Sequence, residues 1–488
     1  MVLPSTSPAI HPAAIRPYRN MSGKSPSVPT QASLSIDFLV VGGGIGGLAC
    51  AIALRRVGHR VLVLEKAASA GSQISGGIRL PPNVSKILFH WGLEAELRKI
   101  SLTSEAIQLN IYESGEILGT HFWEEEVLKE TGGEYLFLHH ADLQRLLHNT
   151  ALSFGAKIRN NATVALVDGD DCHVTLSTGE ILRADAIIGA DGRSSIIQRE
   201  IVGHDVYNDT PHRFVMYNTV VPGHVMRANP DLIPLYEEKH TTLFCWFGDG
   251  RAAMGFRIKG GTDDYALHFW VPPGTQEGGE DVDSWGSKVS VEEMLKQIQP
   301  CEPRLKKMVL KAAPPALIKV KALPALEDWV HDEGRLALIG EAAHPIPVGA
   351  IQAAAMAVED GAVLAKLFSH LGSQDQISSF LYAYQDLREV RCASVVTSEQ
   401  ENLAFQTLPK GEMQEARDNG MRAKYAAGQS VLGGGEAADQ WESLKDLFGY
   451  DAEDQADDWW VKWGILRERA KQSSIDQGLH SGMNNLAL

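Results

Sequence analysis

The sequence predicts an α/β protein whose two domains together give an α+β arrangement. It combines a Rossmann-like dinucleotide-binding domain, an inserted, mostly antiparallel β-sheet domain and a helical C-terminal region. Three observations support this prediction. A strand, a glycine turn, a helix and a second strand fill residues 37–66. Strand-length apolar runs follow one another between 214 and 323, and helix-forming segments dominate after residue 352.

The composition bounds the class of protein. The chain has 488 residues, which is enough for two or three structural units. Hydrophobic residues make up 44% and charged residues 22%, as is ordinary for a soluble globular protein. The formal net charge is -16, and this argues against nucleic-acid binding because such a surface needs a basic face. The net charge does not argue against a small-molecule ligand.

Cysteine usage and the N-terminal residues indicate a compartment. The five cysteines are dispersed without a Cys-x-x-Cys pair, so we expect a reducing, cytoplasmic compartment and no metal site. Residues 38–54 carry no charge, but the stretch is short and rich in glycine, so we expect no transmembrane anchor. Residues 1–35 are rich in Pro, Ser and Ala and contain no acid, which predicts a disordered tail.

The segment 37–66 carries a dinucleotide-binding fingerprint. Gly42, Gly44 and Gly47 give the spacing G-x-G-x-x-G between a strand and a helix, and Glu65 closes the second strand. Gly42 makes the tight turn, Gly44 lets the backbone approach a pyrophosphate, and Gly47 lets the helix pack on the strand. Glu65 can accept a hydrogen bond from a ribose hydroxyl. A glycine-rich packing turn is the alternative, and this unit alone does not distinguish FAD from NAD(P).

Residues 71–211 predict further elements of the same domain. Residues 71–83 indicate a loop, with Asn83 as the N-cap of a helix over 84–91. An apolar run before Asp191-Gly192 indicates a strand that ends in a sharp turn. The other predicted elements are strands over 106–113, 116–121, 163–167 and 173–177 and an amphipathic helix over 139–148.

Residues 214–323 predict a second layer built from strands. Apolar or alternating runs cover 217–221, 242–247, 252–258 and 265–271, followed by helices over 291–298 and 303–312. Aromatic residues gather in this segment. Each one alone indicates ordinary sheet core, whereas together they would suit an apolar or aromatic ligand: Trp246, Phe247, Phe256, Phe269 and Trp270.

A strand over 335–339 ends in Gly340-Glu341, and an alanine-rich helix over 352–368 follows. Gly340 permits close backbone approach, and Glu341 can accept hydrogen bonds from polyol hydroxyls. The N-terminus of the helix, near residues 350–354, offers N–H groups and partial positive charge. Helical segments continue over 379–400 and 436–458.

Three motifs stand in a fixed order: G-x-G-x-x-G with Glu65, then Asp191-Gly192, then Gly340-Glu341. Together they resemble the single-component FAD-dependent aromatic hydroxylases of the p-hydroxybenzoate and salicylate hydroxylase type, most of all their fungal members. The resemblance covers about residues 36–463. It implies that FAD is held as a prosthetic group. The sequence contains a single Rossmann fingerprint, so NAD(P)H would bind transiently as the reductant.

The resemblance implies a monooxygenase that hydroxylates an aromatic or other electron-rich small molecule through a C4a-hydroperoxyflavin. Two alternatives remain. One is an olefin or indole epoxidase of secondary metabolism, and the other is a non-catalytic flavin-binding relative. A flavin halogenase is disfavoured because no W-x-W-x-I-P segment is present. The oligomeric state is not determined by the sequence.

The resemblance also implies the site residues. Tyr217 and Asn218 are expected in catalysis from their place in the family pattern, although spacing does not rank them above His121, Tyr236, His240 and His268. The residues expected to bind the cofactor are Gly42, Gly44, Ile45, Gly47, Glu65, Lys66, Gly77, Ile78, Arg79, His140, Asp191, Gly192, Gly340, Glu341, Ala353 and Ala354.

The chain departs from the family pattern around the flavin ring and the substrate. His140 replaces a flavin-contacting arginine, and Arg79 stands where fungal relatives often have glutamine. Glu341 replaces aspartate, and Ala353 replaces a glycine. Asn218 replaces an arginine that can position a phenolate, so a phenolic substrate is in doubt. The ADP-binding motif is intact, which predicts normal FAD binding with unusual flavin geometry or substrate.

The motifs divide the chain into five parts. We expect tails at 1–35 and 471–488, an FAD-binding domain from 36–211 and 325–400, a substrate-binding sheet domain over 212–324, and a helical region over 401–470.

Overall fold

The computed structural model describes residues 30–70, 76–206, 212–260, 263–273, 288–321, 323–432 and 445–466. Most of the predicted N-terminal tail and all of the C-terminal tail lie outside these residues. Among the described residues, no helix combines the length and the apolar character needed to cross a bilayer.

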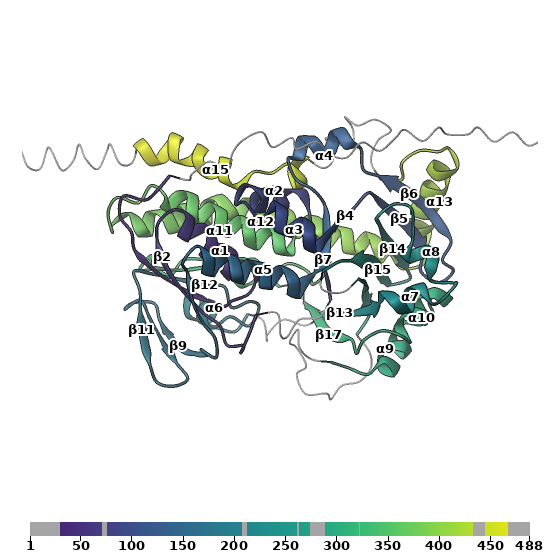
Figure 1. Ribbon diagram of the computed structural model, residues 1–488, viewed down its shortest axis with the longest axis horizontal. Helices are drawn as coiled ribbons and strands as arrows, with labels where there is room; N and C mark the ends of the chain where they lie inside the picture. The colour runs from purple at the N-terminus through teal and green to yellow at the C-terminus, as the bar shows by residue number, and fades with distance from the viewer. Residues whose placement is uncertain are drawn as a thin grey trace, which may run out of the picture.

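A parallel five-stranded sheet with the order β18-β12-β1-β2-β8 forms one half of the molecule. Its central strands are buried on both sides, as the continuous apolar runs predict. Helices α5, α2, α12 and α15 (Ala452–Trp459) pack against α1 or α11, and Figure 1 shows α15 above α11 and α12 in this half. The bounds are β1 Asp37–Val41, β2 Arg60–Leu64, β8 Lys157–Arg159, β12 Ala186–Gly189, β18 Leu336–Leu338, α1 Ile45–Arg56, α2 Pro82–His90, α5 His140–Ser153, α11 Ala353–Phe368 and α12 Gln376–Gln406.

A three-stranded meander, β9 to β11, packs with α6 on the lower side of this half in Figure 1. The strand predictions for 163–167 and 173–177 are confirmed. Ser195 begins α6 as its N-cap, because its hydroxyl accepts a hydrogen bond from the Gln198 N–H at 2.8 Å. The bounds are β9 Val164–Asp168, β10 His173–Leu176, β11 Ile181–Arg183 and α6 Ile196–Val202.

A seven-stranded sheet forms the other half, with the order β17-β13-β16-β15-β14-β5-β6. All of its pairings are antiparallel except β14 with β5. The sheet is therefore wider than the range 212–324, since β5 and β6 come from the first third of the chain. Its bounds are β5 Ala106–Ile111, β6 Ile117–Phe122, β13 His212–Pro222, β14 Thr242–Gly248, β15 Arg251–Ile258, β16 Asp264–Val271 and β17 Ala316–Lys321.

Short helices cover this sheet, and the C-terminal helices follow α12. The predicted helix over 291–298 is confirmed residue for residue, and the one over 303–312 ends at Val309. The bounds are α7 Gly223–Arg227, α8 Ile233–Tyr236, α9 Val291–Ile298, α10 Pro303–Val309, α13 Glu412–Ala426 and α15 Ala452–Trp459, with a π-helical turn at Trp460–Gly464.

A small sheet, β3-β7-β4, joins the two halves, since β7 contacts both α5 and β15. Its presence corrects the prediction of a loop over 71–83, because residues 77–80 pair with β7 as a strand. Residues 71–75 lie outside the described part. The bounds are β3 Gly77–Leu80, β4 Ser101–Thr103 and β7 Leu136–His139, with α3 Glu94–Ile100 and α4 Glu125–Thr131 nearby.

The predicted N-cap role of Asn83 is wrong. Helix α2 begins at Pro82, with Pro81 as its N-cap, and proline suits this first helical position because its missing N–H has no partner there. Asn83 is buried inside the helix instead. Its amide donates hydrogen bonds to Gln352 Oε1 at 2.9 Å and Glu359 Oε1 at 2.7 Å. A polar side chain that looked like a helix cap therefore belongs to a tertiary contact with α11.

The sheet half has apolar clusters on both faces, and the five aromatic residues divide between them. Trp246 and Phe269 belong to one cluster, and Phe247, Phe256 and Trp270 to the other. Each ring is almost fully buried. These residues are sheet core, which was the ordinary interpretation of each.

Candidate active site

One large cavity, of about 560 Å³, lies between the parallel sheet and the seven-stranded sheet. Its volume is typical of ligand sites. Sixteen of the eighteen residues predicted for the site line it, and the exceptions are Gly47 and Tyr217. We call the end near β1, α1 and β2 the nucleotide end and the end near β13, β16 and β17 the sheet end.

The nucleotide end is built from backbone around three glycines. Gly42 has φ +109°, and a Cβ there would lie 2.3 Å from the Ala190 carbonyl oxygen. A Cβ on Gly44 would meet no atom within 4 Å, so this backbone faces open cavity. A Cβ on Gly47 would lie 1.9 Å from the Gly42 carbonyl oxygen. Gly47 therefore packs helix on strand without lining the cavity, as its proposed role requires.

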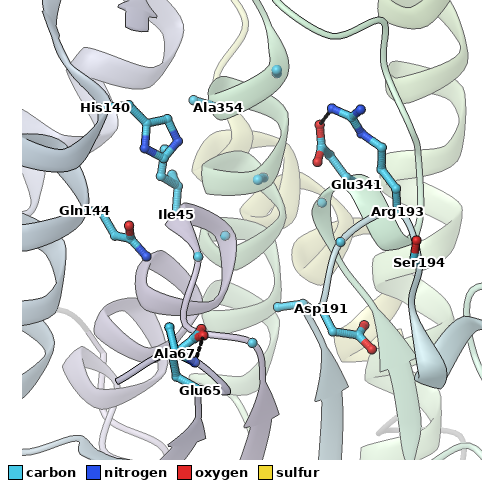
Figure 2. A pocket seen from close by; sticks show the side chains of 18 of the residues that line it. Ile45, Glu65, Ala67, His140, Gln144, Asp191, Arg193, Ser194, Glu341 and Ala354 are labelled. Atoms are coloured by element: carbon cyan, nitrogen blue, oxygen red, sulfur yellow. Dashed lines mark hydrogen bonds and ion pairs between the residues drawn. The ribbon is translucent and has the colours of Figure 1, made fainter. Parts of the chain in front are cut away.

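Glu65 directly follows β2 and lies at the bottom of the view in Figure 2. One carboxylate oxygen accepts from the Gly43 N–H at 2.7 Å and the other from the Ala67 N–H at 2.7 Å. These contacts fix the carboxylate, and its remaining lone pairs can accept from a ligand hydroxyl. Gln144 of α5, which sequence reasoning missed, donates to the Gly43 carbonyl at 2.9 Å and holds the same turn.

Asp191 lines the cavity but points its carboxylate into the fold. Its oxygens accept from the Ser195 hydroxyl at 2.5 Å and the Ile196 N–H at 2.8 Å, so it ties the turn to the start of α6. Although these hydrogen bonds lower it, burial raises the pKa of Asp191 above its usual value. Asp191 thus shapes the turn that presents Gly192, which has φ +79°, to the cavity.

An ion pair crosses the middle of the cavity wall. Arg193 Nη2 lies 2.9 Å from Glu341 Oε1, joining the turn after β12 to the turn after β18 (Figure 2). Sequence reasoning assigned Glu341 and missed Arg193, although Arg193 directly follows the Asp191-Gly192 motif. The pair places an acceptor and a donor where a polyol chain between the two turns could meet both.

His140 and the N-terminus of α11 face each other across the cavity (Figure 2). Burial lowers the pKa of His140 to about 4, although Glu341 opposes this shift. The imidazole is therefore neutral at physiological pH and does not replace the positive charge of an arginine. Helix α11 begins after Gln352, and Ala353 and Ala354 line the cavity, which leaves the partial positive charge of this helix end to act there.

The sheet end is formed by side chains from separate strands. Met216 and Asn218 come from β13, His268 from β16 and Ile318 from β17. Asn218 and His268 are direct cross-strand neighbours, and so are His268 and Met254 of β15. The result is a buried polar strip with apolar residues beside it.

Tyr217 faces the other way. Side chains alternate along a strand, so Tyr217 points to the opposite face of β13 from Met216 and Asn218. It is buried among residues such as Trp246 and Phe269, and burial raises its pKa to about 12. This placement argues against a catalytic role. The other candidate bases divide similarly, since His268 lines the cavity and His121, Tyr236 and His240 do not.

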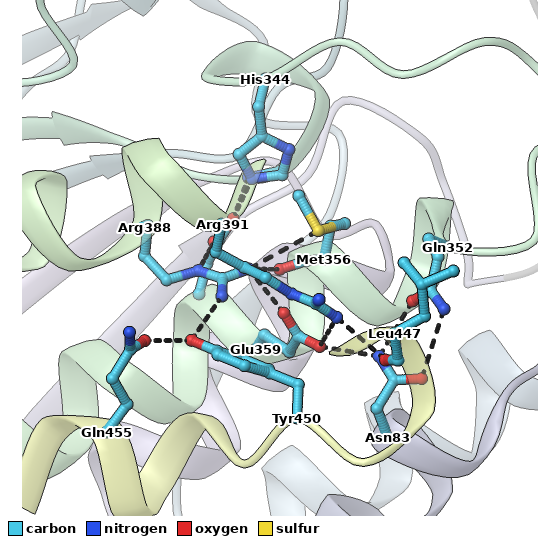
Figure 3. A network of polar contacts seen from close by, with 12 residues as sticks. Asn83, His344, Gln352, Met356, Glu359, Arg388, Arg391, Leu447, Tyr450 and Gln455 are labelled. Atoms are coloured by element: carbon cyan, nitrogen blue, oxygen red, sulfur yellow. Dashed lines mark hydrogen bonds and ion pairs between the residues drawn. The ribbon is translucent and has the colours of Figure 1, made fainter. Parts of the chain in front are cut away.

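A buried network of charges supports α11 on its side away from the cavity (Figure 3). Arg388 of α12 is fully buried and lies 2.8 Å from both Glu359 Oε2 and Asp360 Oδ1. Glu359 also accepts from Asn83, whose amide contacts Gln352 at the start of α11. The network therefore fixes the helix end that faces the cavity.

His344 completes this network. Its Nε2 lies 2.5 Å from Asp360 Oδ2, which also accepts from the Gly340 N–H at 2.7 Å. Although burial opposes it, the Asp360 carboxylate raises the pKa of His344 to about 10. Cys392 lies near enough to form a metal-type trio with these two side chains. The Asp360 oxygens, however, already accept hydrogen bonds from His344, the Gly340 N–H and Arg388.

Comparisons with known proteins identify similar chains. Residues 35–399 match the family described as FAD binding domain. The chain is 28% identical over 422 residues to the FAD-dependent monooxygenase OpS4 of Beauveria bassiana, covering 86% of this chain and 95% of that protein. It is 29% identical over 374 residues to a 6-hydroxynicotinate 3-monooxygenase of Bordetella bronchiseptica, covering 75% and 91%. The crystal structure of CtdE in complex with FAD and a substrate superposes with a TM-score of 0.71 at 20% identity, covering 89% of this chain and 100% of that one.

Proposed function

The chain belongs to the FAD-binding family of flavoprotein monooxygenases, and from this premise we propose that it uses NAD(P)H and dioxygen to hydroxylate an aromatic or other electron-rich small molecule. The observation that carries the proposal is the continuity of the large cavity. One space runs from the backbone cradle at Gly44 to the buried side chains at Asn218 and His268. It can hold a dinucleotide at one end and a second, smaller molecule at the other.

The residues at the nucleotide end fit FAD. The open space at Gly44 lets a pyrophosphate approach the start of α1, which has no side-chain cap of its own. Glu65 would accept from the adenosine ribose, and Glu341, fixed by Arg193, would accept from the ribityl chain. When bound and reduced by NAD(P)H, FAD would activate dioxygen, so that one oxygen atom is transferred to an electron-rich carbon and the other leaves as water.

The protein's own residues orient the reactants and exclude water. The N-terminus of α11 would stabilise negative charge on the flavin edge beside Ala353. Met216 and Ile318 would pack against the body of the substrate, and the polar strip would fix its orientation. Neutral His140 adds no positive charge beside this helix end.

We also propose the domain boundaries at residues 212 and 325, which are supported by the change from the parallel sheet to the large sheet and back, apart from β5 and β6. The boundary at 401 would fall inside α12. A reducing, cytoplasmic compartment is supported by the five cysteines, all of which are free thiols.

Rapid mixing of the purified holoenzyme with NADH or NADPH tests the function. We expect bound flavin to bleach, faster with a suitable aromatic ligand present, and labelled dioxygen to place one labelled atom in a hydroxylated product. A labelled epoxide from an olefin or indole would favour the epoxidase alternative. Flavin that neither nicotinamide bleaches, across a panel of phenols, aromatic acids and indoles, would leave a non-catalytic flavin-binding protein.

A further inference from the structure

We propose that Arg79 is the counter-ion of an acidic oxygen on the substrate, a phenolate, enolate or carboxylate, and so determines specificity in the reaction proposed above. Arg79 lies on β3, which begins directly beside Asn218, since a Cβ on Gly76 would lie 2.3 Å from the Asn218 amide. The charge that the family arginine would bring from β13 would thus reach the substrate from the neighbouring strand β3.

The contacts of Arg79 place it over the polar strip. Its Nη1 donates to Met254 Sδ at 2.9 Å, and its Nη2 donates to the Gly349 carbonyl. Met254 is the cross-strand neighbour of His268, and His268 is the neighbour of Asn218. One guanidinium, one imidazole and one amide therefore converge on the sheet end.

The charge of Arg79 has no ion-pair partner in the part of the chain that the structure describes. The side chain is only 4% exposed, and its hydrogen bonds go to a thioether and a carbonyl. A guanidinium stays protonated even when buried, and a buried charge without a counter-ion is costly. Glu399 is the nearby acid, but burial raises the pKa of its carboxyl group although the charge of Arg79 opposes this shift, and its Oε1 accepts from the Gln352 N–H at 3.0 Å. An anionic ligand oxygen would offset this cost.

His268 adds a neutral partner. The side chain is 3% exposed, and apart from a marginal contact with the Gly77 backbone neither ring nitrogen has a hydrogen-bond partner among the described residues. Burial, reinforced by the charge of Arg79, lowers the pKa of His268 to about 3. A neutral imidazole can donate to an anionic oxygen through one nitrogen without adding charge.

The remaining surface defines the rest of the ligand. Met216 and Ile318 flank the strip with apolar side chains. The site thus suits a flat apolar body that carries one ionised oxygen. The site is therefore compatible with acidic aromatic substrates, although Asn218 stands on β13 in place of the family arginine.

Equilibrium binding to the holoenzyme tests the proposal without turnover, so its outcome is independent of whether the hydroxylation proposal holds. The probes are benzoate and its neutral counterpart benzamide, followed through the absorbance of bound flavin. We expect wild type to prefer benzoate, and Arg79→Gln to weaken benzoate binding about 10- to 100-fold while changing benzamide less than about twofold. Arg79→Lys should recover part of the loss.

The control is Arg257→Gln, since Arg257 lies on β15 three residues after Met254, outside the cavity, and pairs with Asp263 at 3.5 Å. It should leave both probes unchanged. Equal binding of the two probes to wild type, or benzoate binding that Arg79→Gln does not weaken, would overturn the proposal. So would unchanged benzoate binding with a shifted flavin reduction potential, because Arg79 would then act on the cofactor. If Arg79→Gln fails to fold, Arg79→Lys and the benzoate preference of wild type decide.

Discussion

The two ends of the large cavity differ in what lines them, since one is mainly backbone and the other mainly side chains. The nucleotide end is backbone, with three glycines and one acid drawn from a continuous stretch of thirty residues between 37 and 66. The sheet end is side chains from β3, β13, β16 and β17, and its contact between Arg79 and Gly349 joins residues 270 positions apart. A local motif can therefore encode cofactor binding, whereas substrate specificity depends on long-range strand pairing.

The largest expected effect tests whether the two ends share one support. Replacing Arg388 by methionine removes the cation that Glu359 and Asp360 share, and leaves Arg391 at 3.5 Å from Glu359 and His344 at 2.5 Å from Asp360. We expect a loss of about 3 kcal/mol in the free energy of unfolding, because two buried carboxylates then keep one cationic neighbour each in place of two. FAD affinity and probe binding should fall together, since the network holds the start of α11.

Chemical denaturation and flavin titration measure this prediction. The matched control is Arg159→Met, which removes an exposed pair with Glu180 and should cost less than about 1 kcal/mol. If Arg388→Met were as mild as the control, the network would not be the support that links the two ends.

A pair of glycine substitutions separates folding from cofactor binding at the nucleotide end. In Gly47→Ala the new methyl group meets the Gly42 carbonyl, so we expect about 1–3 kcal/mol of destabilisation or more. In Gly44→Ala the methyl group enters open cavity, so the fold should be kept and FAD should bind about 10- to 100-fold more weakly.

Thermal unfolding and the flavin content after gel filtration distinguish the two variants. Neither should change the preference of the sheet end for one probe over another once FAD is saturating. A Gly44→Ala protein that retained full FAD affinity would mean that the cofactor does not approach this turn.

The same difference explains how much the sequence could predict. The first unit was predictable to within a few residues, because glycine spacing and apolar runs are local. Residue types alone could not reveal that Tyr217 points away from the cavity and that Asn218 points into it, since this depends on the pleat of β13. Likewise, no local signal joins Asn83 to Glu359, so a helix cap was the natural but wrong interpretation.

The sheet itself was predicted in part. Six of its seven strands were predicted from their apolar or alternating runs, but β5 and β6 were assigned to the other domain, whereas β14 pairs in parallel with β5 from more than a hundred residues earlier. Such a pairing has no turn that would mark it in the sequence. His268 was one of five candidate bases for the same reason, and the register with Asn218 and Met254 is what singles it out.

The smallest expected effects concern pH, and they differ in sign between the cavity and the network. His140 and His268 have pKa values lowered to about 4 and about 3, against 6.5 when exposed. The unfolded chain therefore binds more protons below pH 6.5, and the stability from these groups, full above pH 6.5, is lost as pH falls. His344, with its pKa raised to about 10, contributes fully below pH 6.5 and loses its contribution as pH rises toward 10.

We expect each cavity histidine to change stability by about 1 kcal/mol between pH 6.5 and 5.5. Thermal unfolding of wild type, His268→Gln and His344→Gln across pH 5 to 10 measures both limbs. His268→Gln should flatten the acid limb, and His344→Gln the alkaline limb. The lowered pKa of His268 matters for the cavity, because an uncharged His268 at neutral pH leaves Arg79 as the cation of the sheet end. An acid limb unchanged in His268→Gln would mean that this imidazole is hydrated, and the strip would then be more open to water than its burial implies.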